Sequence, residues 1–156
     1  MKKFLALIIS LALLCALCAC GGSKEAETSF EPADLSAKLL DSGCFTDIMS
    51  EMDVSVAMDI YGADAALIDK ASIYMGTGAT AEEIAVLKAK DSNGAKALLD
   101  AMNTRVEAQI EAYKNYVPAE VPKLEDASVS QSGVYVVYVT SADSATSQKI
   151  IEEFMR

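Results

Sequence analysis

Residues 134–139 read Val-Tyr-Val-Val-Tyr-Val and contain no charged side chain. Valine and tyrosine favour strands, because branched and aromatic side chains fit a pleated surface. A strand that is apolar on both faces is typical of the interior of a sheet. We therefore expect this segment to be an interior strand, and this expectation constrains the fold more than any other feature of the chain.

The residues before this strand predict its hairpin partner. Residues 125–131 alternate, with Ala127 and Val129 on one side and serines on the other, as a half-buried strand does. Ser132-Gly133 then gives the signal of a tight turn. Residues 125–139 are therefore predicted to form a β-hairpin.

A second hairpin is predicted upstream. Residues 71–75 have the composition of a strand, and the turn sequence Gly76-Thr77-Gly78-Ala79 follows. Residues 83–90 fit the partner strand, but Thr80 and Glu83 have the spacing of a capping box, which favours a helix. Because the polar run Asp91-Ser92-Asn93-Gly94 would make that helix very short, a strand is favoured and a helix remains the alternative.

Helices are predicted in four places. The clearest spans residues 92–115, where apolar residues recur on one face and charged residues on the other, as in an amphipathic helix packed on a core. A first helix begins near Pro32 and ends before Gly43, as proline and glycine at these places favour. Residues 53–61 suit a short helix slightly better than a strand. A last helix begins near Ala142, with Ser141 as its cap.

These elements predict an α+β fold. Strands joined by short turns pair antiparallel, and the helices between the hairpins must cover the resulting sheet. We expect a single domain at residues 32–156, built on an antiparallel sheet of about four strands from the two hairpins, with helices packed on it.

The N-terminus predicts export and lipid anchoring. Lys2 and Lys3 precede an apolar run at residues 4–17, which is the order of parts in a secretory signal and is shorter than a membrane-spanning helix requires. Leu17-Cys18-Ala19-Cys20 resembles the bacterial lipobox, which implies removal of residues 1–19 and diacylation of Cys20. Residues 20–31 would then be a lipidated, flexible tether. The alternative is an uncleaved N-terminal membrane helix.

Charge and cysteine content limit the partners. The chain carries a net charge of −10, and loss of Lys2 and Lys3 with the signal would make it more negative. Such a charge opposes nucleic-acid binding, which needs clustered basic residues, so no nucleic-acid partner is expected. The expected contact with the membrane is the lipid on Cys20. Among the cysteines, Cys44 alone would remain free, so no internal disulfide is expected and Cys44 is predicted to be a small buried residue.

No motif of the sequence predicts a reaction. The chain has no histidine, Gly76-Thr77-Gly78 lacks the lysine of a phosphate-binding loop, and the acidic residues of 47–69 lack the spacing of a calcium loop. We therefore predict no catalytic residue, no metal site and no cofactor. The candidates for ligand contact are large amphipathic or cationic side chains: Tyr74, Arg105, Tyr113 and Tyr116. For Arg105, an ion pair with a nearby acid is the simpler expectation.

The chain also resembles a known family. The stretches concerned include Tyr74-Met75-Gly76, residues 79–86, the helix through Arg105, Tyr116-Val117-Pro118 and residues 133–137. Over roughly residues 34–154 they resemble small lipoproteins of Gram-positive bacteria that are catalogued as a domain of unknown function. The resemblance implies a surface-tethered extracytoplasmic domain and carries over no activity and no functional residue.

Three functions agree with these observations. The leading hypothesis is a lipid-anchored binding or accessory module on the extracytoplasmic face of the cell membrane, which would contact an envelope protein or a small ligand. The second is a histidine-independent envelope hydrolase that uses carboxylates or a Ser–Lys pair. The third is a structural or inhibitory protein that docks through the edge of its sheet.

Overall fold

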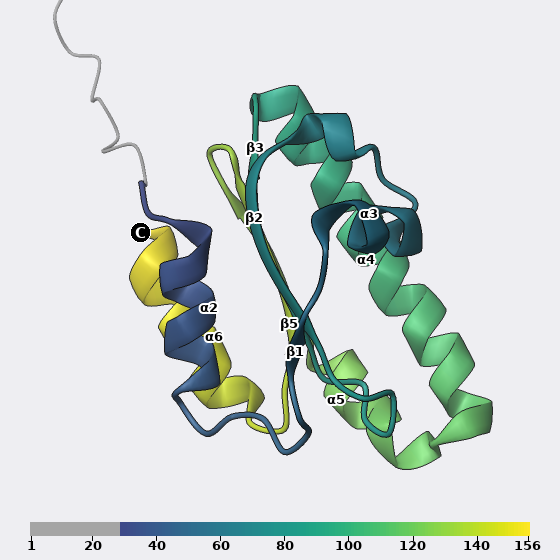
Figure 1. Ribbon diagram of the computed structural model, residues 1–156. Coiled ribbons are helices and arrows are strands. Elements are labelled where there is room, and N and C mark those ends of the chain that lie inside the picture. The colour runs from purple at the N-terminus through teal and green to yellow at the C-terminus, as the bar shows by residue number, and fades with distance from the viewer. Residues whose placement is uncertain (1–28) are drawn as a thin grey trace, which may run out of the picture.

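The computed structural model describes residues 29–156, so the predicted signal at residues 1–19, Cys20 and nearly all of the tether lie outside the described residues. The described part is one α+β domain, as predicted (Figure 1). Its elements are α2 (Pro32–Leu40), β1 (Ser50–Glu51), α3 (Val54–Tyr61), β2 (Ile68–Met75), β3 (Glu83–Ala89), α4 (Ser92–Tyr116), α5 (Val121–Glu125), β4 (Ser128–Ser132), β5 (Tyr135–Thr140) and α6 (Ser144–Met155). Short 3-10 helices lie at Ala65–Leu67 and Pro118–Glu120.

The sheet has the strand order β1-β2-β3-β5-β4, and every neighbouring pair is antiparallel. The two predicted hairpins, β2–β3 and β4–β5, are both present. They are joined through β3 and β5, in a register that places Ile84 opposite Val139 and Leu87 opposite Val136. The sheet has five strands instead of about four, because the two-residue strand β1 also pairs with β2.

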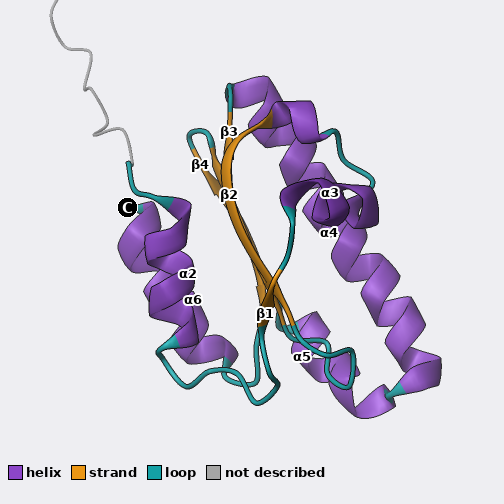
Figure 2. Cartoon of the chain, in the orientation of Figure 1, coloured by secondary structure: helices purple, strands orange, loops and turns teal. Residues whose placement is uncertain are grey.

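Helices cover both faces of the sheet (Figure 2). On one side α2 and α6 pack against Ile84, Val86, Val137 and Val139. On the other side α3 and α4 pack against Ala85, Leu87, Val136 and Tyr138. Successive side chains of a strand point to opposite faces, so two covered faces require strands that are apolar throughout. This explains why β5 is buried along its whole length.

Both ambiguous segments take the favoured conformation. Residues of α3 form a helix because Asp53 caps it, with its Oδ1 atom accepting hydrogen bonds from the amides of Ser55 and Val56. Gly62 ends the helix with a φ of 66°, a conformation that favours glycine. Residues of β3 form a strand, and the Thr80 hydroxyl donates to Asp47 instead of capping a helix.

Two details of the prediction are wrong. Helix α6 begins at Ser144, and its cap is Asp143, whose carboxylate accepts from the Thr146 amide; the hydroxyl of Ser141 is buried against that of Ser147 instead. The second hairpin begins at Ser128, because residues up to Glu125 form the short helix α5. Cys44 is buried, as predicted.

The chain enters the domain at one end of the sheet. The ring of Phe30 stacks on Tyr135 with a centroid distance of 4.3 Å, and the Tyr135 hydroxyl donates to the Phe30 carbonyl oxygen at 2.9 Å. The same end holds the β4–β5 turn and the C-terminus, whereas the β2–β3 loop and α5 lie at the opposite end (Figure 1). None of the helices within residues 29–156 is long and apolar enough to span a membrane.

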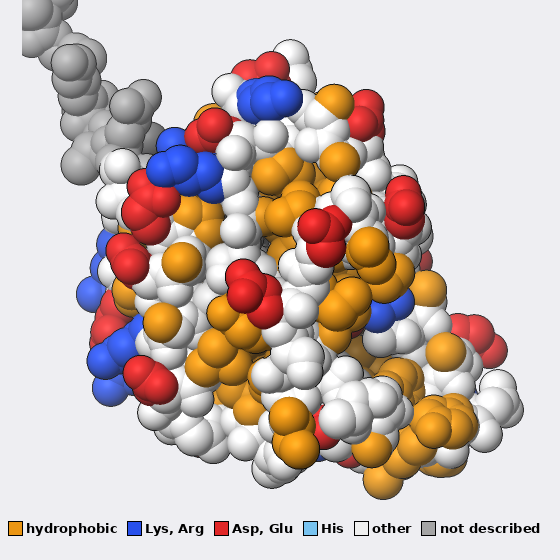
Figure 3. Space-filling model, viewed as in Figure 1, with side chains coloured by type: hydrophobic (Ala, Val, Ile, Leu, Met, Phe, Trp, Pro, Cys, Tyr) orange, Lys and Arg blue, Asp and Glu red, His pale blue; other side chains and the backbone are white. Residues whose placement is uncertain are grey.

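Charge is spread over the visible surface. On the face drawn in Figure 3, apolar side chains appear between the two helical layers, and acidic side chains are interspersed among them and along the margins. The negative charge is therefore not gathered into one patch on this face.

Candidate functional site

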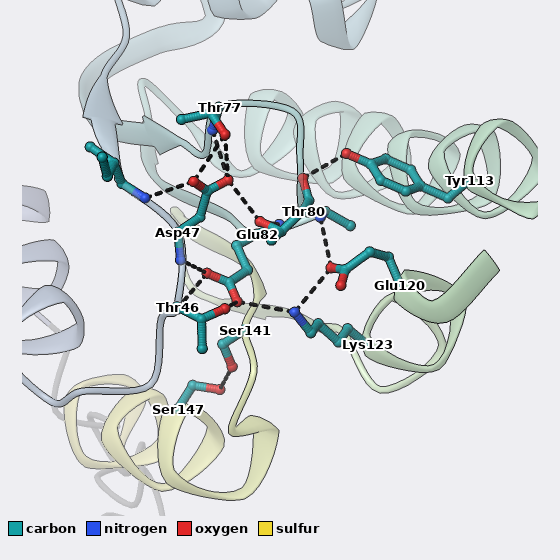
Figure 4. Close-up of polar contacts among 12 residues, drawn as sticks. Thr46, Asp47, Thr77, Thr80, Glu82, Tyr113, Glu120, Lys123, Ser141 and Ser147 are labelled. Atoms are coloured by element: carbon teal, nitrogen blue, oxygen red, sulfur yellow. Dashed lines mark hydrogen bonds and ion pairs between the residues drawn. The ribbon is translucent and has the colours of Figure 1, made fainter. Parts of the chain in front are cut away.

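The β2–β3 loop, residues 76–82, is fixed to the loop between α2 and β1 by a carboxylate. Asp47 accepts hydrogen bonds from the Thr77 amide, the Thr77 hydroxyl and the Thr80 hydroxyl, each at 2.9 Å (Figure 4). Burial alone would raise the pKa of Asp47, but the hydrogen bonds from the Ile48 amide and from both threonines outweigh it and lower the pKa. The loop is therefore held in one shape by charge-assisted hydrogen bonds.

A second carboxylate joins this assembly to α5. Glu82 accepts from the amides of Thr46 and Asp47 at 2.8 and 2.9 Å, and from Lys123 Nζ at 3.2 Å. Lys123 also pairs with Glu120, which accepts from the Ala81 amide (Figure 4). Burial would raise the pKa of Glu82, but the Thr46 hydroxyl, the two amides and Lys123 together hold it below its ordinary value.

Gly76 is required by this packing. A Cβ atom at Gly76 would lie 2.6 Å from Asp47 Oδ2 and 3.2 Å from the carbonyl oxygen of Glu82. We expect Gly76→Ala to lower the free energy of unfolding by about 1–3 kcal/mol, as overpacking does. Urea titration followed by circular dichroism measures this loss.

The matched control is Gly94→Ala in α4. A Cβ atom there would meet its nearest neighbour at 3.5 Å, and alanine is a better helix former than glycine. We expect this variant to be as stable as the wild type or more stable. Equal stability of the two variants would contradict the tight packing of Asp47 on Gly76.

The opposite side of the loop carries a buried ion pair. Glu83 follows Glu82 in an extended backbone and therefore points to the other face of the sheet. There it pairs with Arg105 of α4, with Nη2 of Arg105 3.0 Å from Oε2 of Glu83. The Glu83 side chain is 3% exposed and that of Arg105 is 18% exposed, so the pair is sheltered from water and its exposed part belongs mainly to Arg105.

Two tyrosines surround this pair. Burial and then the charge of Glu83 raise the pKa of both Tyr61 and Tyr138 above the ordinary tyrosine range. The charge of Glu83 acts on the Tyr61 hydroxyl. Neither this hydroxyl nor Oε1 of Glu83, however, forms a hydrogen bond of good geometry to any described residue. The Arg105 guanidinium also lies 5.8 Å from the centre of the Tyr61 ring, within the range of a cation–π contact.

A cavity of about 220 Å³ opens between α4 and the loop. Helix α4 contributes Arg105, Gln109 and Tyr113, which are spaced four residues apart and so lie on one face of the helix. The Tyr113 hydroxyl donates to the carbonyl oxygen of Thr80 at 2.6 Å (Figure 4), which holds the loop against the helix. The loop contributes the backbone of Gly76 and Gly78.

The four predicted contact residues fall in different places. Arg105 and Tyr113 both line the cavity, and Arg105 also forms the expected ion pair. Tyr116 is 70% exposed and packs edge-on against Tyr113 at a ring distance of 6.0 Å, beside the cavity. Tyr74 lies on the other face of the sheet, with the apolar cluster under α2 and α6.

Several site residues had no sequence prediction. Asp47 belongs to the acidic residues that lack the spacing of a calcium loop, and the structure shows that it is the acceptor that orders the loop at residues 76–82. Gln109 shares the helical face of Arg105 and Tyr113, and this spacing was the signal that could have found it. Within the described residues, no group of three or more acidic or cysteine side chains is arranged to hold a metal ion.

Comparison with known families identifies the chain at the level of a family. A family model described as Domain of unknown function (DUF4358) matches residues 42–141, which is more than half of the chain. The chain belongs to this family. The predicted membership of a family of unknown function is thus confirmed. No match was found among curated proteins or among solved structures.

The DUF4358 match contains the whole candidate site. It covers the five strands of the sheet, α3, α4 and α5, and with them the Asp47 and Glu82 contacts, the Glu83–Arg105 pair and the cavity. Helices α2 and α6 lie outside the matched residues. The DUF4358 unit of this chain is therefore the sheet with one helical layer, and α2 and α6 complete the cover of the other face.

Proposed function

We propose that this protein is a lipid-anchored extracytoplasmic binding module that takes up a small polar ligand in the cavity between α4 and residues 76–82. The observation that carries the proposal is the position of that cavity. It lies at the end of the sheet opposite to Phe30, where the chain enters the domain. A tether that leads from Phe30 to a lipid on Cys20 would leave the cavity facing away from the membrane.

The chemistry of the cavity defines the ligand class. Its lining combines polar groups, among them the Arg105 guanidinium, the Gln109 amide and the Glu83 carboxylate, with the apolar side chains of Met75 and Ala81. Since Glu83 already neutralises Arg105, the ligand does not need to carry a negative charge. The proposed ligand is therefore a small molecule that accepts hydrogen bonds from Arg105 and Gln109, such as an amide, a sugar or an amino acid.

The anchoring part of the proposal is tested by replacing Cys20. In cells that express the full chain, the wild type should partition into detergent with the membrane fraction and incorporate labelled palmitate. Cys20→Ala should lose the label, because the thiol that carries the lipid is absent, and two acyl chains are what make such anchoring firm. A Cys20→Ala protein that keeps the label would contradict lipid attachment at Cys20.

The binding part is tested separately on the full chain in detergent micelles. A panel of amino acids, dipeptides and soluble cell-wall fragments is added, and chemical-shift changes of the α4 amides are recorded. Gln109→Ala should weaken any binding, whereas Lys96→Gln, an exposed change on the same helix, should not. Shift changes that are equal in both variants would place the ligand elsewhere.

A further inference from the structure

The outer strand β4 forms one edge of the sheet and pairs with no second strand among the described residues. It pairs with β5 on one side and is the last strand in the order β1-β2-β3-β5-β4. The turn Gly133–Val134 closes the hairpin at the pair Ser132 and Tyr135. In a hairpin with a two-residue turn, the closing pair and every second pair from it exchange main-chain hydrogen bonds. The amide and carbonyl groups of Val129 and Gln131 therefore point away from β5.

Two hollows flank this edge, one on each face of the sheet. The hollow beside α6 has a volume of about 310 Å³ and is lined by Ser128, Ser130, Ile151 and Met155 among others. The hollow beside α4 and α5 has a volume of about 380 Å³. Its apolar lining comes from Val106, Ile110, Leu124, Ala127 and Val129.

An added strand would fill both hollows at once. Successive side chains of a strand point to opposite faces of a sheet, so a segment paired with Val129 and Gln131 would place neighbouring side chains alternately in the two hollows. The hydroxyls of Ser128 and Ser130 are buried without a partner among the described residues. Gln148 and Glu152 also line the hollow beside α6, which therefore offers polar groups as well as apolar surface.

The charges around the edge select the occupant. The charged residues that line the two hollows are Glu107, Glu125 and Glu152, and no described lysine or arginine lines either one. Glu152 lies 4.0 Å from Arg156 in an exposed ion pair, so Glu107 and Glu125 contribute most of the attraction for a basic partner. Pairing of two copies through β4 would bring these acids together twice, and like charges across an interface oppose association. A basic partner is favoured for the same reason.

We propose that β4 receives an extended segment of a partner protein as an additional strand, and that this segment carries apolar residues flanked by lysine or arginine. Main-chain hydrogen bonds would supply affinity, and the two hollows and the acids would supply specificity, as in other cases of strand addition. The proposal does not depend on the cavity at α4 and stands if no small ligand binds there. The other edge strand, β1, has only two residues, which is one way to protect an edge from such pairing.

The test uses the full chain in detergent micelles and a fluorescent probe peptide that has three valines flanked by lysines. The variant Gln131→Pro removes an outward N–H group but takes no hydrogen bond from the ladder, so proline is tolerated there. Its matched control is Gln131→Thr, which keeps the N–H. Loss of one main-chain hydrogen bond should weaken peptide binding by about three- to tenfold in Gln131→Pro, measured by fluorescence anisotropy. The control should bind like the wild type.

A second pair of variants tests the charge without touching the strand. Glu107→Gln with Glu125→Gln should weaken binding of the lysine-flanked peptide severalfold, whereas Asp100→Asn, on the same helix but outside both hollows, should not. The same peptide with glutamates in place of lysines should not bind. Equal binding of both peptides, equal binding to Gln131→Pro, or no binding of the lysine-flanked peptide would overturn the proposal. So would concentration-dependent dimerisation that is lost in Gln131→Pro, since a second copy would then be the occupant.

Discussion

Replacement of Arg105 by methionine should lower the free energy of unfolding by about 3–5 kcal/mol, the usual cost of removing one partner from a buried ion pair. Glu83 is 2% exposed, and its charge would remain in the core without the guanidinium. Methionine is unbranched and keeps the packing of the aliphatic stem of arginine, so the unpaired charge dominates the loss. Urea unfolding of the chain from residue 21, which contains every described residue, measures this cost.

Two further variants separate charge from packing. The double variant Arg105→Met with Glu83→Met should recover most of the lost stability, since apolar replacement of a whole buried pair is often neutral. Lys114→Met is the matched control on the same helix. Its pair with Glu111 is largely exposed, so the expected loss is below about 1 kcal/mol. A loss in Arg105→Met as small as that in Lys114→Met would show that the pair contributes little.

The elements that sequence predicts well are those with a long, regular pattern. The unbroken apolar run of β5 and the apolar face of α4 both reflect burial that repeats over many residues. Strand β1 and helix α5 have two and five residues, so neither is long enough to show a period. The cap of α6 was misplaced because Ser141 and Asp143 are both good capping residues, and only tertiary packing places the Ser141 hydroxyl against Ser147.

The candidate site also has one part that the sequence predicts and one part that it does not. Arg105, Gln109 and Tyr113 share a face of α4, and helical spacing is visible in the sequence. The partners of these side chains are not visible in the sequence, because Glu83 and the Thr80 carbonyl group contact them only when β3 is packed against α4. Two adjacent acids, Glu82 and Glu83, stand directly before the apolar residues 84–87 of β3, and this position was the available sign that both carboxylates have dedicated partners.

Replacement of Glu82 by glutamine should also be costly, by about 2–4 kcal/mol at neutral pH. One carboxylate oxygen becomes a donor, and the N–H groups of Thr46, Asp47 or Lys123 then lose a charged acceptor, which costs about 1.5–3 kcal/mol for each such hydrogen bond. The α2–β1 loop and α5 both depend on Glu82. The loss should therefore appear as earlier hydrogen exchange in these segments as well as in the global stability.

The effect of Glu82→Gln should depend on pH in a definite direction. Because folding lowers the pKa of Glu82 below its ordinary value of 4.5, the unfolded chain takes up a proton first as the pH falls. The stabilisation by Glu82 is therefore complete above the ordinary value and is lost as the pH falls through the folded pKa. The stability difference between wild type and Glu82→Gln, measured by urea unfolding, should be largest at neutral pH and shrink in acid. Asp53 and Asp143, which cap other helices, are common to both proteins, so their titration largely cancels in the difference. A stability difference that stays constant from neutral to acidic pH would mean that the Glu82 charge does not hold the α2–β1 loop and α5 in place.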